Sequence, residues 1–214
     1  MTEILLIRHG ETEWNAERRL QGHLDIGLNQ AGRRQAELLA QTLRSEHLDA
    51  VIASDLQRAL HTAQTIAAPR AMTVTIDPAL RERCFGAFEG LLYDDIGVHF
   101  PVACTAWKTR DLDTRYPPGE RIAETLREFS ARAVAAVLGH AQRHHGQKIA
   151  ILTHGGVLDC LYRAALGIDL EKPRDFDITN TAINRFGWNE GTLQLLRWGD
   201  VSHLARQALD EMNY

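Results

Sequence analysis

The sequence predicts an α/β fold, a three-layer α/β/α sandwich with a mostly parallel sheet, an antiparallel edge and an insertion over the functional site. Short apolar runs alternate with segments whose apolar residues recur at the helical period, which is typical of βα units and a parallel sheet. Two further strand-like runs near the end of the chain flank a short polar turn, which indicates a hairpin. A chain of 214 residues fits one domain, so we expect residues 1–214 to form a single unit.

The first half of the chain contains two strands, each followed by a helix. The apolar residues 4–7 read as a buried strand that ends in a charged turn, and residues 28–44 have the period of an amphipathic helix with Asn29 as its cap. A second short buried strand is predicted over residues 50–54. The helix after it runs from the polar residues that follow this strand to about residue 67.

The second half predicts two more parallel strands and the hairpin. Residues 73–76 alternate β-branched side chains, residues 122 to about 140 show strong helical periodicity, and residues 148–153 form the fourth buried strand. Residues 182–186 and 193–197 would form the hairpin at the edge of the sheet. An edge of this kind could pair with a second copy of the chain, so a homodimer is possible.

Residues 91–120 are the least regular part of the sequence. Aromatic residues and scattered charges alternate there without a clear period, and the segment ends in Pro117-Pro118-Gly119. So long an irregular segment inside a compact domain is usually a functional loop, so we expect a lid-like insertion at about 91–120.

Composition and charge exclude several classes of function. The net charge of −4 and the absence of a Lys/Arg run argue against a nucleic-acid partner. No apolar run approaches the ~20 residues that span a bilayer, and strand-like sequence begins at once, so we expect no membrane association and a cytoplasmic protein. Cys84, Cys104 and Cys160 show no C-x-x-C spacing, so reduced and mostly buried thiols are expected rather than disulfides or a zinc site.

Three predicted strands are each followed at once by polar side chains. These are Arg8-His9, Ser54-Asp55 with Arg58, and Thr153-His154. The carboxyl ends of parallel strands lie at one edge of the sheet, so these groups should converge where ligands bind in open α/β sheets. Two arginines and two histidines would then share one site, which needs no metal.

This set of residue types suits phosphoryl transfer. Arg8 and Arg58 would supply permanently charged forks that match a phosphoryl group. A neutral imidazole such as His9 is a competent nucleophile, and His154 could act as a cation or hydrogen-bond donor to the equatorial oxygens. Glu82 is the carboxyl group that could protonate the leaving oxygen and then deprotonate water.

The chain resembles the histidine phosphatase superfamily, through five motifs that follow one another in the same order. They are Leu6-Ile7-Arg8-His9-Gly10-Glu11-Thr12 with Asn15, Leu20-Gln21-Gly22, Ser54-Asp55-Leu56-Gln57-Arg58-Ala59, Leu80-Arg81-Glu82-Arg83 with Phe85-Gly86 and Glu89-Gly90, and Thr153-His154-Gly155-Gly156. The resemblance extends from residue 4 to about 200. It is greatest to the branch that holds cofactor-dependent phosphoglycerate mutases and their bacterial phosphatase relatives.

The resemblance implies a role for each matching residue. His9 would be the phosphorylated nucleophile and Glu82 the general acid/base. Further residues would bind the phosphoryl group or the substrate: Arg8, Asn15, Gln21, Gly22, Arg58, Glu82, His154 and Gly155, the last through its backbone N–H. Neither a metal ion nor another cofactor is expected, and the partner would be a small phosphorylated metabolite.

Three departures from the mutase pattern favour a phosphatase. The mutases of this family carry a lysine where this chain has Tyr93, two adjacent arginines in the insertion, and an asparagine shortly after the second histidine, where this chain has Gly155-Gly156. A mutase must hold a doubly phosphorylated intermediate, which needs more cations. A phosphoglycerate mutase dependent on a bisphosphate primer remains the alternative, and a catalytically silent binding protein is a third.

Several residues allow two interpretations. Arg110 or Arg115 could reach the pocket and bind a substrate carboxylate or a second phosphate. Tyr93, Phe100 and Trp107 could contact substrate, although packing of the insertion is the simpler interpretation. His140, His144 and His145 have a spacing that could suit a metal, but a solvated helix end is favoured. His23 could lie at the pocket mouth or on a surface turn.

Overall fold

The computed structural model of the protein describes residues 1–204, and its centre is a six-stranded sheet in the order β3-β2-β4-β1-β5-β6. The strands are β1 (Thr2–Arg8), β2 (Ala50–Ala53), β3 (Val74–Ile76), β4 (Lys148–Thr153), β5 (Ile183–Asn189) and β6 (Thr192–Asp200). The four strands from β3 to β1 are parallel, and β5 and β6 are antiparallel to their neighbours. The predicted mostly parallel sheet with an antiparallel edge is confirmed.

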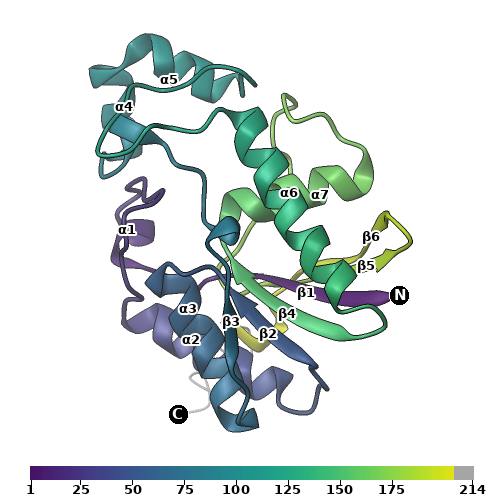
Figure 1. The fold of residues 1–214 in the computed structure, drawn as a ribbon. Helices are drawn as coiled ribbons and strands as arrows, with labels where there is room; N and C mark the ends of the chain where they lie inside the picture. The colour runs from purple at the N-terminus through teal and green to yellow at the C-terminus, as the bar shows by residue number, and fades with distance from the viewer. Residues whose placement is uncertain (205–214) are drawn as a thin grey trace.

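Helices cover both faces of this sheet and complete the three predicted layers (Figure 1). The helices are α1 (Glu13–Ala16), α2 (Gln30–Leu43), α3 (Gln57–Ala67), α4 (Tyr93–His99), α5 (Pro101–Lys108), α6 (Leu126–Arg143) and α7 (Gly155–Leu166), with short 3₁₀ turns at Ala68–Arg70, Pro78–Leu80 and Gly86–Phe88. Along β1, Leu5 and Ile7 pack toward α2 and α3, whereas Ile4 and Leu6 pack toward α6 and α7. Successive strand side chains point to opposite faces, so one fully buried strand serves both cores. None of the helices within residues 1–204 is long and apolar enough to cross a membrane.

The structure confirms one predicted helix boundary and corrects another. The side chain of Asn29 accepts a hydrogen bond from the Gly32 backbone and caps α2, as predicted. The helix predicted to start at residue 122 instead begins at Leu126. Thr125 and Glu128 form a capping box there, and these reciprocal hydrogen bonds fix the helix start.

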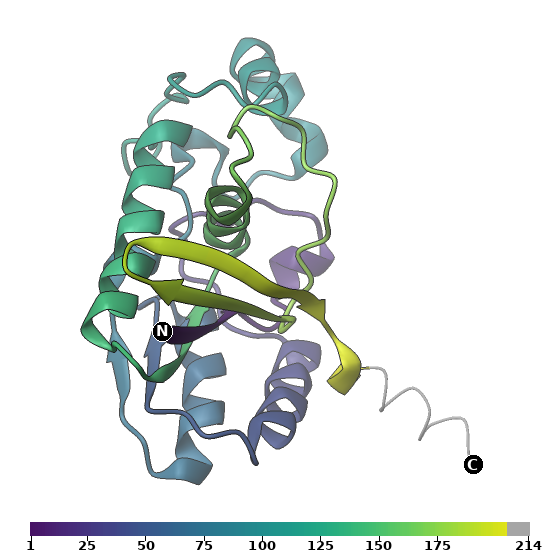
Figure 2. The same ribbon diagram turned by 90° about the vertical axis from the view of Figure 1, so that its right-hand side faces the viewer.

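The hairpin turn is tighter than the sequence suggested (Figure 2). Trp188 and Asn189, which lie outside the strand runs predicted at residues 182–186 and 193–197, belong to β5, and only Glu190 and Gly191 connect the two strands. Both connecting residues have positive φ, 48° and 86°, which is the backbone of the two-residue turns that match the twist of paired strands.

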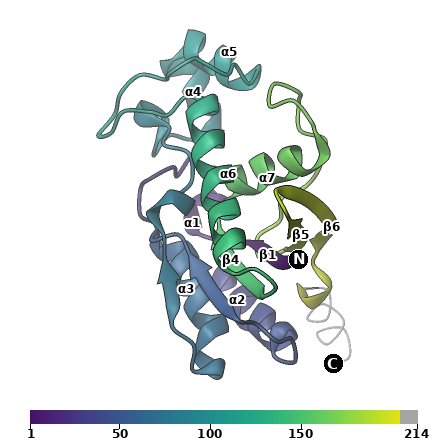
Figure 3. The same cartoon turned by 45° about the vertical axis from the view of Figure 1, so that its right-hand side comes forward.

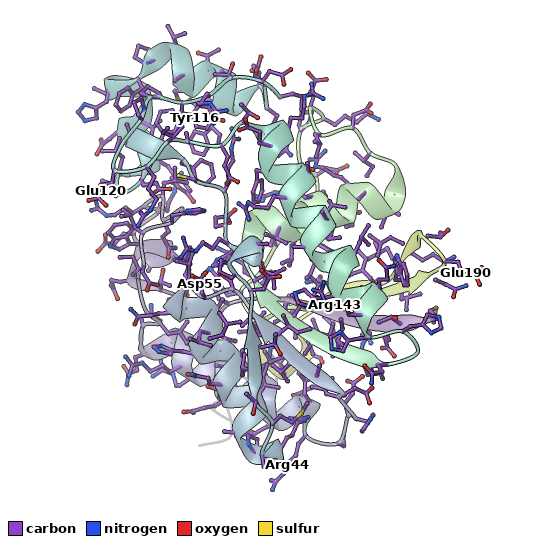
Figure 4. The ribbon with its side chains drawn as sticks, viewed as in Figure 1. Arg44, Asp55, Tyr116, Glu120, Arg143 and Glu190 are labelled. Carbon is purple, nitrogen blue, oxygen red and sulfur yellow. The ribbon has the colours of Figure 1, made fainter. Side chains whose placement is uncertain are left out.

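The insertion is more regular than expected, because α4 and α5 lie within residues 91–120. Figure 3 shows these helices at the end of α6 that lies away from the N-terminal strand. They surround a small core of their own, in which Tyr116 stacks on Phe88 with ring centroids 4.6 Å apart. Figure 4 shows Tyr116 within this group of side chains. Residues 91–120 therefore form a packed structure rather than an irregular loop.

Candidate active site

The predicted site residues meet at the carboxyl ends of β2, β4 and β1, in a cleft of about 730 Å³. Eight of them line the cleft: Arg8, His9, Asn15, Gln21, Gly22, Arg58, Glu82 and Gly155. His154 is not among the lining residues. It is fully buried beside His9, with 5.3 Å between the two ring centroids.

His9 follows β1 directly and is 3% exposed. Its Nδ1 lies 2.7 Å from the carbonyl oxygen of Gly10. A carbonyl can only accept a hydrogen bond, so we assign the ring proton to Nδ1, which leaves a lone pair on Nε2. Burial, followed by the charges of Arg58 and Arg8, holds the pKa of His9 well below its ordinary value. His9 is therefore neutral at pH 7 and has the free nitrogen that a nucleophile needs.

Arg58 is buried and Arg8 is half-buried, and neither cation has a carboxylate partner among residues 1–204. Arg8 donates to the Ile178 carbonyl at 2.7 Å, and Arg58 donates to the carbonyls of Gly22 at 2.7 Å and Leu24 at 2.9 Å. The buried Nε of each arginine has no hydrogen-bond partner within the described residues. Burial lowers the pKa of Arg58 to about 10, so this guanidinium stays charged at pH 7. Buried and unpaired donors of this kind favour an anion.

The Glu82 carboxylate lies at the N-terminus of α7. One of its oxygens accepts a hydrogen bond from the Gly156 backbone at 3.0 Å, and the other accepts from the Arg83 backbone at 2.8 Å. The Glu82 carbonyl in turn lies 3.2 Å from an Arg132 nitrogen and 2.8 Å from Nε2 of His23. These contacts fix both the backbone and the carboxylate of Glu82 at the cleft.

The segment after β1, which includes α1, supplies three of the predicted residues. Asn15 forms a capping box with Thr12, which fixes the start of α1. Gln21 is 8% exposed, and its buried Oε1 has no partner within residues 1–204. Gly22 has a φ of +53°, and a Cβ there would lie 2.1 Å from an oxygen of Glu89, so this position requires glycine.

Comparison with known proteins assigns the family. The family model of the histidine phosphatase superfamily (branch 1) matches residues 4–201. The chain belongs to the histidine phosphatase superfamily. It is 41% identical over 207 residues to phosphoglycerate mutase-like protein 4 of Arabidopsis thaliana, an alignment that covers 94% of this chain and 86% of the relative.

Solved structures show the same fold. The YhfR structure of Bacillus stearothermophilus is 33% identical, with a TM-score of 0.87, and the match covers 95% of this chain and all of the other. A phosphoserine phosphatase of Entamoeba histolytica in complex with 3-phosphoglyceric acid is 26% identical, with a TM-score of 0.83 over 95% of this chain and all of the other. This histidine phosphatase superfamily member therefore has relatives named both as mutase-like proteins and as phosphatases.

Arg174 and Asn180 of this histidine phosphatase superfamily member lie at the cleft but were not predicted there from the sequence. Arg174 lines the cleft, and Asn180 both lines it and donates to the His9 carbonyl at 2.8 Å. Both residues lie in the loop between α7 and β5, which has no periodic pattern to connect it with the site. The one available signal was a basic residue beside a proline, Pro173-Arg174, in a stretch without periodicity.

The insertion contributes aromatic residues to the cleft, although the sequence favoured a purely packing role for them. Tyr93 and Trp107 line the cleft and also pack edge to face with centroids 5.7 Å apart, whereas Phe100 packs on Phe88. Of the two arginines that could reach the pocket, Arg110 lines the cleft. Its guanidinium is already bound at 2.6 Å by Asp159 of α7.

Three further expectations are corrected or resolved. Arg115 is not among the cleft residues and pairs with Glu128 at 2.5 Å. His140, expected at a solvated helix end, is only 4% exposed; its Nε2 lies 2.7 Å from a carboxylate oxygen of Asp77, and its Nδ1 lies 3.0 Å from Arg143. His23 is not among the residues lining the cleft, although it contacts the Glu82 backbone.

Proposed function

We propose that this protein is a metal-independent phosphomonoesterase that hydrolyses small phosphorylated metabolites through a phosphohistidine on His9. The observation that carries the proposal is the pairing of a neutral His9, whose Nε2 is free, with two arginines whose buried Nε atoms lack partners within the described residues. A phosphoryl dianion would satisfy the arginines and present its phosphorus to a nucleophile. Fixed cations of this kind stabilise the charge of the transferring group.

In the first step, the lone pair of His9 Nε2 attacks phosphorus and the bond to the ester oxygen breaks. Arg8, Arg58 and His154 hold the equatorial oxygens, and Glu82, in its protonated form, donates a proton to the leaving oxygen. The products are the free alcohol and phosphohistidine. Two displacements replace one difficult step.

In the second step, water attacks the phosphohistidine. The Glu82 carboxylate takes a proton from this water, the P–N bond breaks, and inorganic phosphate leaves with the electron pair returned to Nε2. The hydrogen bonds from Arg83 and Gly156 hold the Glu82 carboxylate in place. Glu82 thereby returns to the protonated form that starts the next cycle.

One observation favours the alternative, a phosphoglycerate mutase dependent on a bisphosphate primer. Lys108 and Arg174 line the cleft in addition to Arg8 and Arg58, so the site holds more cations than the sequence alone suggested. Against this, the Arg110 guanidinium is already held by Asp159, a carboxylate that it shares with Arg163, and Tyr93 stands where the family's mutases have a lysine. We therefore place hydrolysis first.

The test measures phosphate release from a panel of phosphomonoesters that includes phosphosugars, phosphoserine and 3-phosphoglycerate, in a chelator and without added metal. A parallel reaction contains 3-phosphoglycerate with 2,3-bisphosphoglycerate and is assayed for isomerisation. Rapid release without isomerisation is expected. Isomerisation that depends on the bisphosphate and outpaces release would replace the phosphatase with the mutase.

A further inference from the structure

His154 and Ser54 form a buried pair at the carboxyl end of the sheet. Because β4 lies between β2 and β1, His154 has Ser54 on one side and His9 on the other. Nε2 of His154 lies 2.9 Å from Oγ of Ser54, and neither residue is exposed. The distance is that of a hydrogen bond, but its direction depends on which ring nitrogen carries the proton.

The other contacts of Ser54 decide this direction. The backbone N–H of Leu56 donates to Ser54 Oγ at 3.3 Å, so one lone pair of the hydroxyl already accepts a hydrogen bond. Within residues 1–204, Nε2 of His154 is the acceptor available to the Ser54 hydroxyl proton. A proton on Nε2 would leave that hydroxyl without an acceptor in a fully buried position, at a cost of about 1–3 kcal/mol.

The opposite nitrogen of His154 has no partner among residues 1–204 that would prevent it from carrying the proton. Nδ1 is buried and has no hydrogen-bond partner within the described residues. The same is true of the Nε atoms of Arg8 and Arg58. Burial and the nearby Arg58 charge hold the pKa of His154 well below its ordinary value, so the ring carries one proton at pH 7. That single proton belongs on the nitrogen that Ser54 does not contact.

We propose that Ser54 is a positioning residue that holds His154 in the Nδ1–H tautomer, so that Nδ1–H donates a hydrogen bond to the phosphoryl group. The inference rests on the proposed phosphate pocket. The two histidines then have complementary tautomers: His9 donates through Nδ1 to Gly10 and keeps Nε2 as nucleophile, whereas His154 accepts at Nε2 and keeps a donor at Nδ1. A histidine can thus stabilise the transferring group without becoming a cation.

The first test reads the tautomer directly. The full chain is labelled with ¹⁵N, and two-bond ¹H–¹⁵N correlation spectra of the histidine rings are recorded at pH 7 for the unaltered protein, S54A and S54T. We expect a protonated Nδ1 in the unaltered protein and in S54T, which keeps the hydroxyl, and a mixture of both tautomers in S54A. T2V is the matched control, because it removes a fully buried hydroxyl at the opposite end of β1.

The second test measures the rate of phosphohistidine formation from p-nitrophenyl phosphate in a single turnover. S54A should be about 10- to 100-fold slower, the range expected when a partner that orients a functional imidazole is lost. S54T and T2V should stay within a few fold of the unaltered protein. This step is common to a phosphatase and a mutase, so its result does not depend on which reaction follows.

Two results would overturn the proposal. One is a protonated Nε2 on His154 in the unaltered protein, which needs no variant to fold. The other is an unchanged His154 tautomer in S54A, whatever happens to the rate, because Ser54 would then not determine the position of the proton. Failure of the proposed hydrolysis would appear instead in the substrate panel, with the tautomer spectra unaffected.

Discussion

Gly156 has no room for a side chain because of Glu82. A Cβ at Gly156 would lie 2.2 Å from Oε1 of Glu82 and 3.0 Å from two ring carbons of Phe129. Glu82 is the more easily displaced, since Phe129 is 2% exposed and packed in the core. G156A therefore moves the Glu82 carboxylate away from the position that Gly156 and Arg83 hold.

The change should reduce catalysis far more than it affects stability. A correctly placed general acid/base contributes about 10²- to 10⁴-fold, so kcat/KM should fall by about 100-fold or more. In stability, alanine gains about 1 kcal/mol of helix propensity over glycine within α7, and crowding costs about 1–3 kcal/mol. The free energy of unfolding should therefore fall by no more than about 2 kcal/mol.

The assay combines steady-state kinetics with denaturant unfolding of G156A and a matched control, G139A. Gly139 also lies inside a helix, but a Cβ there would meet the Arg143 guanidinium at an ordinary 3.5 Å. G139A should keep full activity and gain a few tenths to 1 kcal/mol of stability. An unchanged kcat/KM in folded G156A would show that the Glu82 carboxylate is not needed where the structure has it.

Three further predictions follow from the structure. H9A should fold but abolish phosphate release, because no other group supplies the proposed nucleophile; activity near that of the unaltered protein would refute the mechanism. Arg185 lowers the pKa of Glu46 from 4.5 to about 2, so this carboxylate contributes stability that is present above pH 4.5 and lost as the pH falls through 2. Thermal unfolding of E46Q should accordingly start from a lower midpoint at pH 7 and decline less between pH 4.5 and 2; parallel curves for E46Q and the unaltered protein would contradict this. R174A should raise KM for substrates with a second anionic group and change kcat little, whereas R115A, which alters a pair outside the cleft, should leave KM unchanged; equal KM values for both variants would exclude Arg174 from substrate binding.

The sequence determined the local elements and the chemical type of the site. Apolar runs such as residues 4–7 can only be buried on both faces, which requires helices on each side of a parallel sheet. Polar residues directly after three such runs, His9 and His154 among them, must then lie at the same edge of the sheet. These conclusions hold because periodicity and strand direction are local properties of the chain.

Only the tertiary structure decided which groups touch. The strand order places β4 between β2 and β1, and this order sets His154 between Ser54 and His9. The loop that carries Arg174 has no periodicity, so nothing in its residues tied it to the cleft.

His140 shows the same limit within a regular element. Its helical position predicted solvent, but the side chain is buried and contacts Asp77, which is distant in the sequence. Likewise, Gly156 reads as a flexible residue in the sequence, and its lack of a Cβ matters only because Glu82 occupies that space. Contacts between residues far apart in the chain depend on how the layers pack, and a single sequence carries no local signal of that packing.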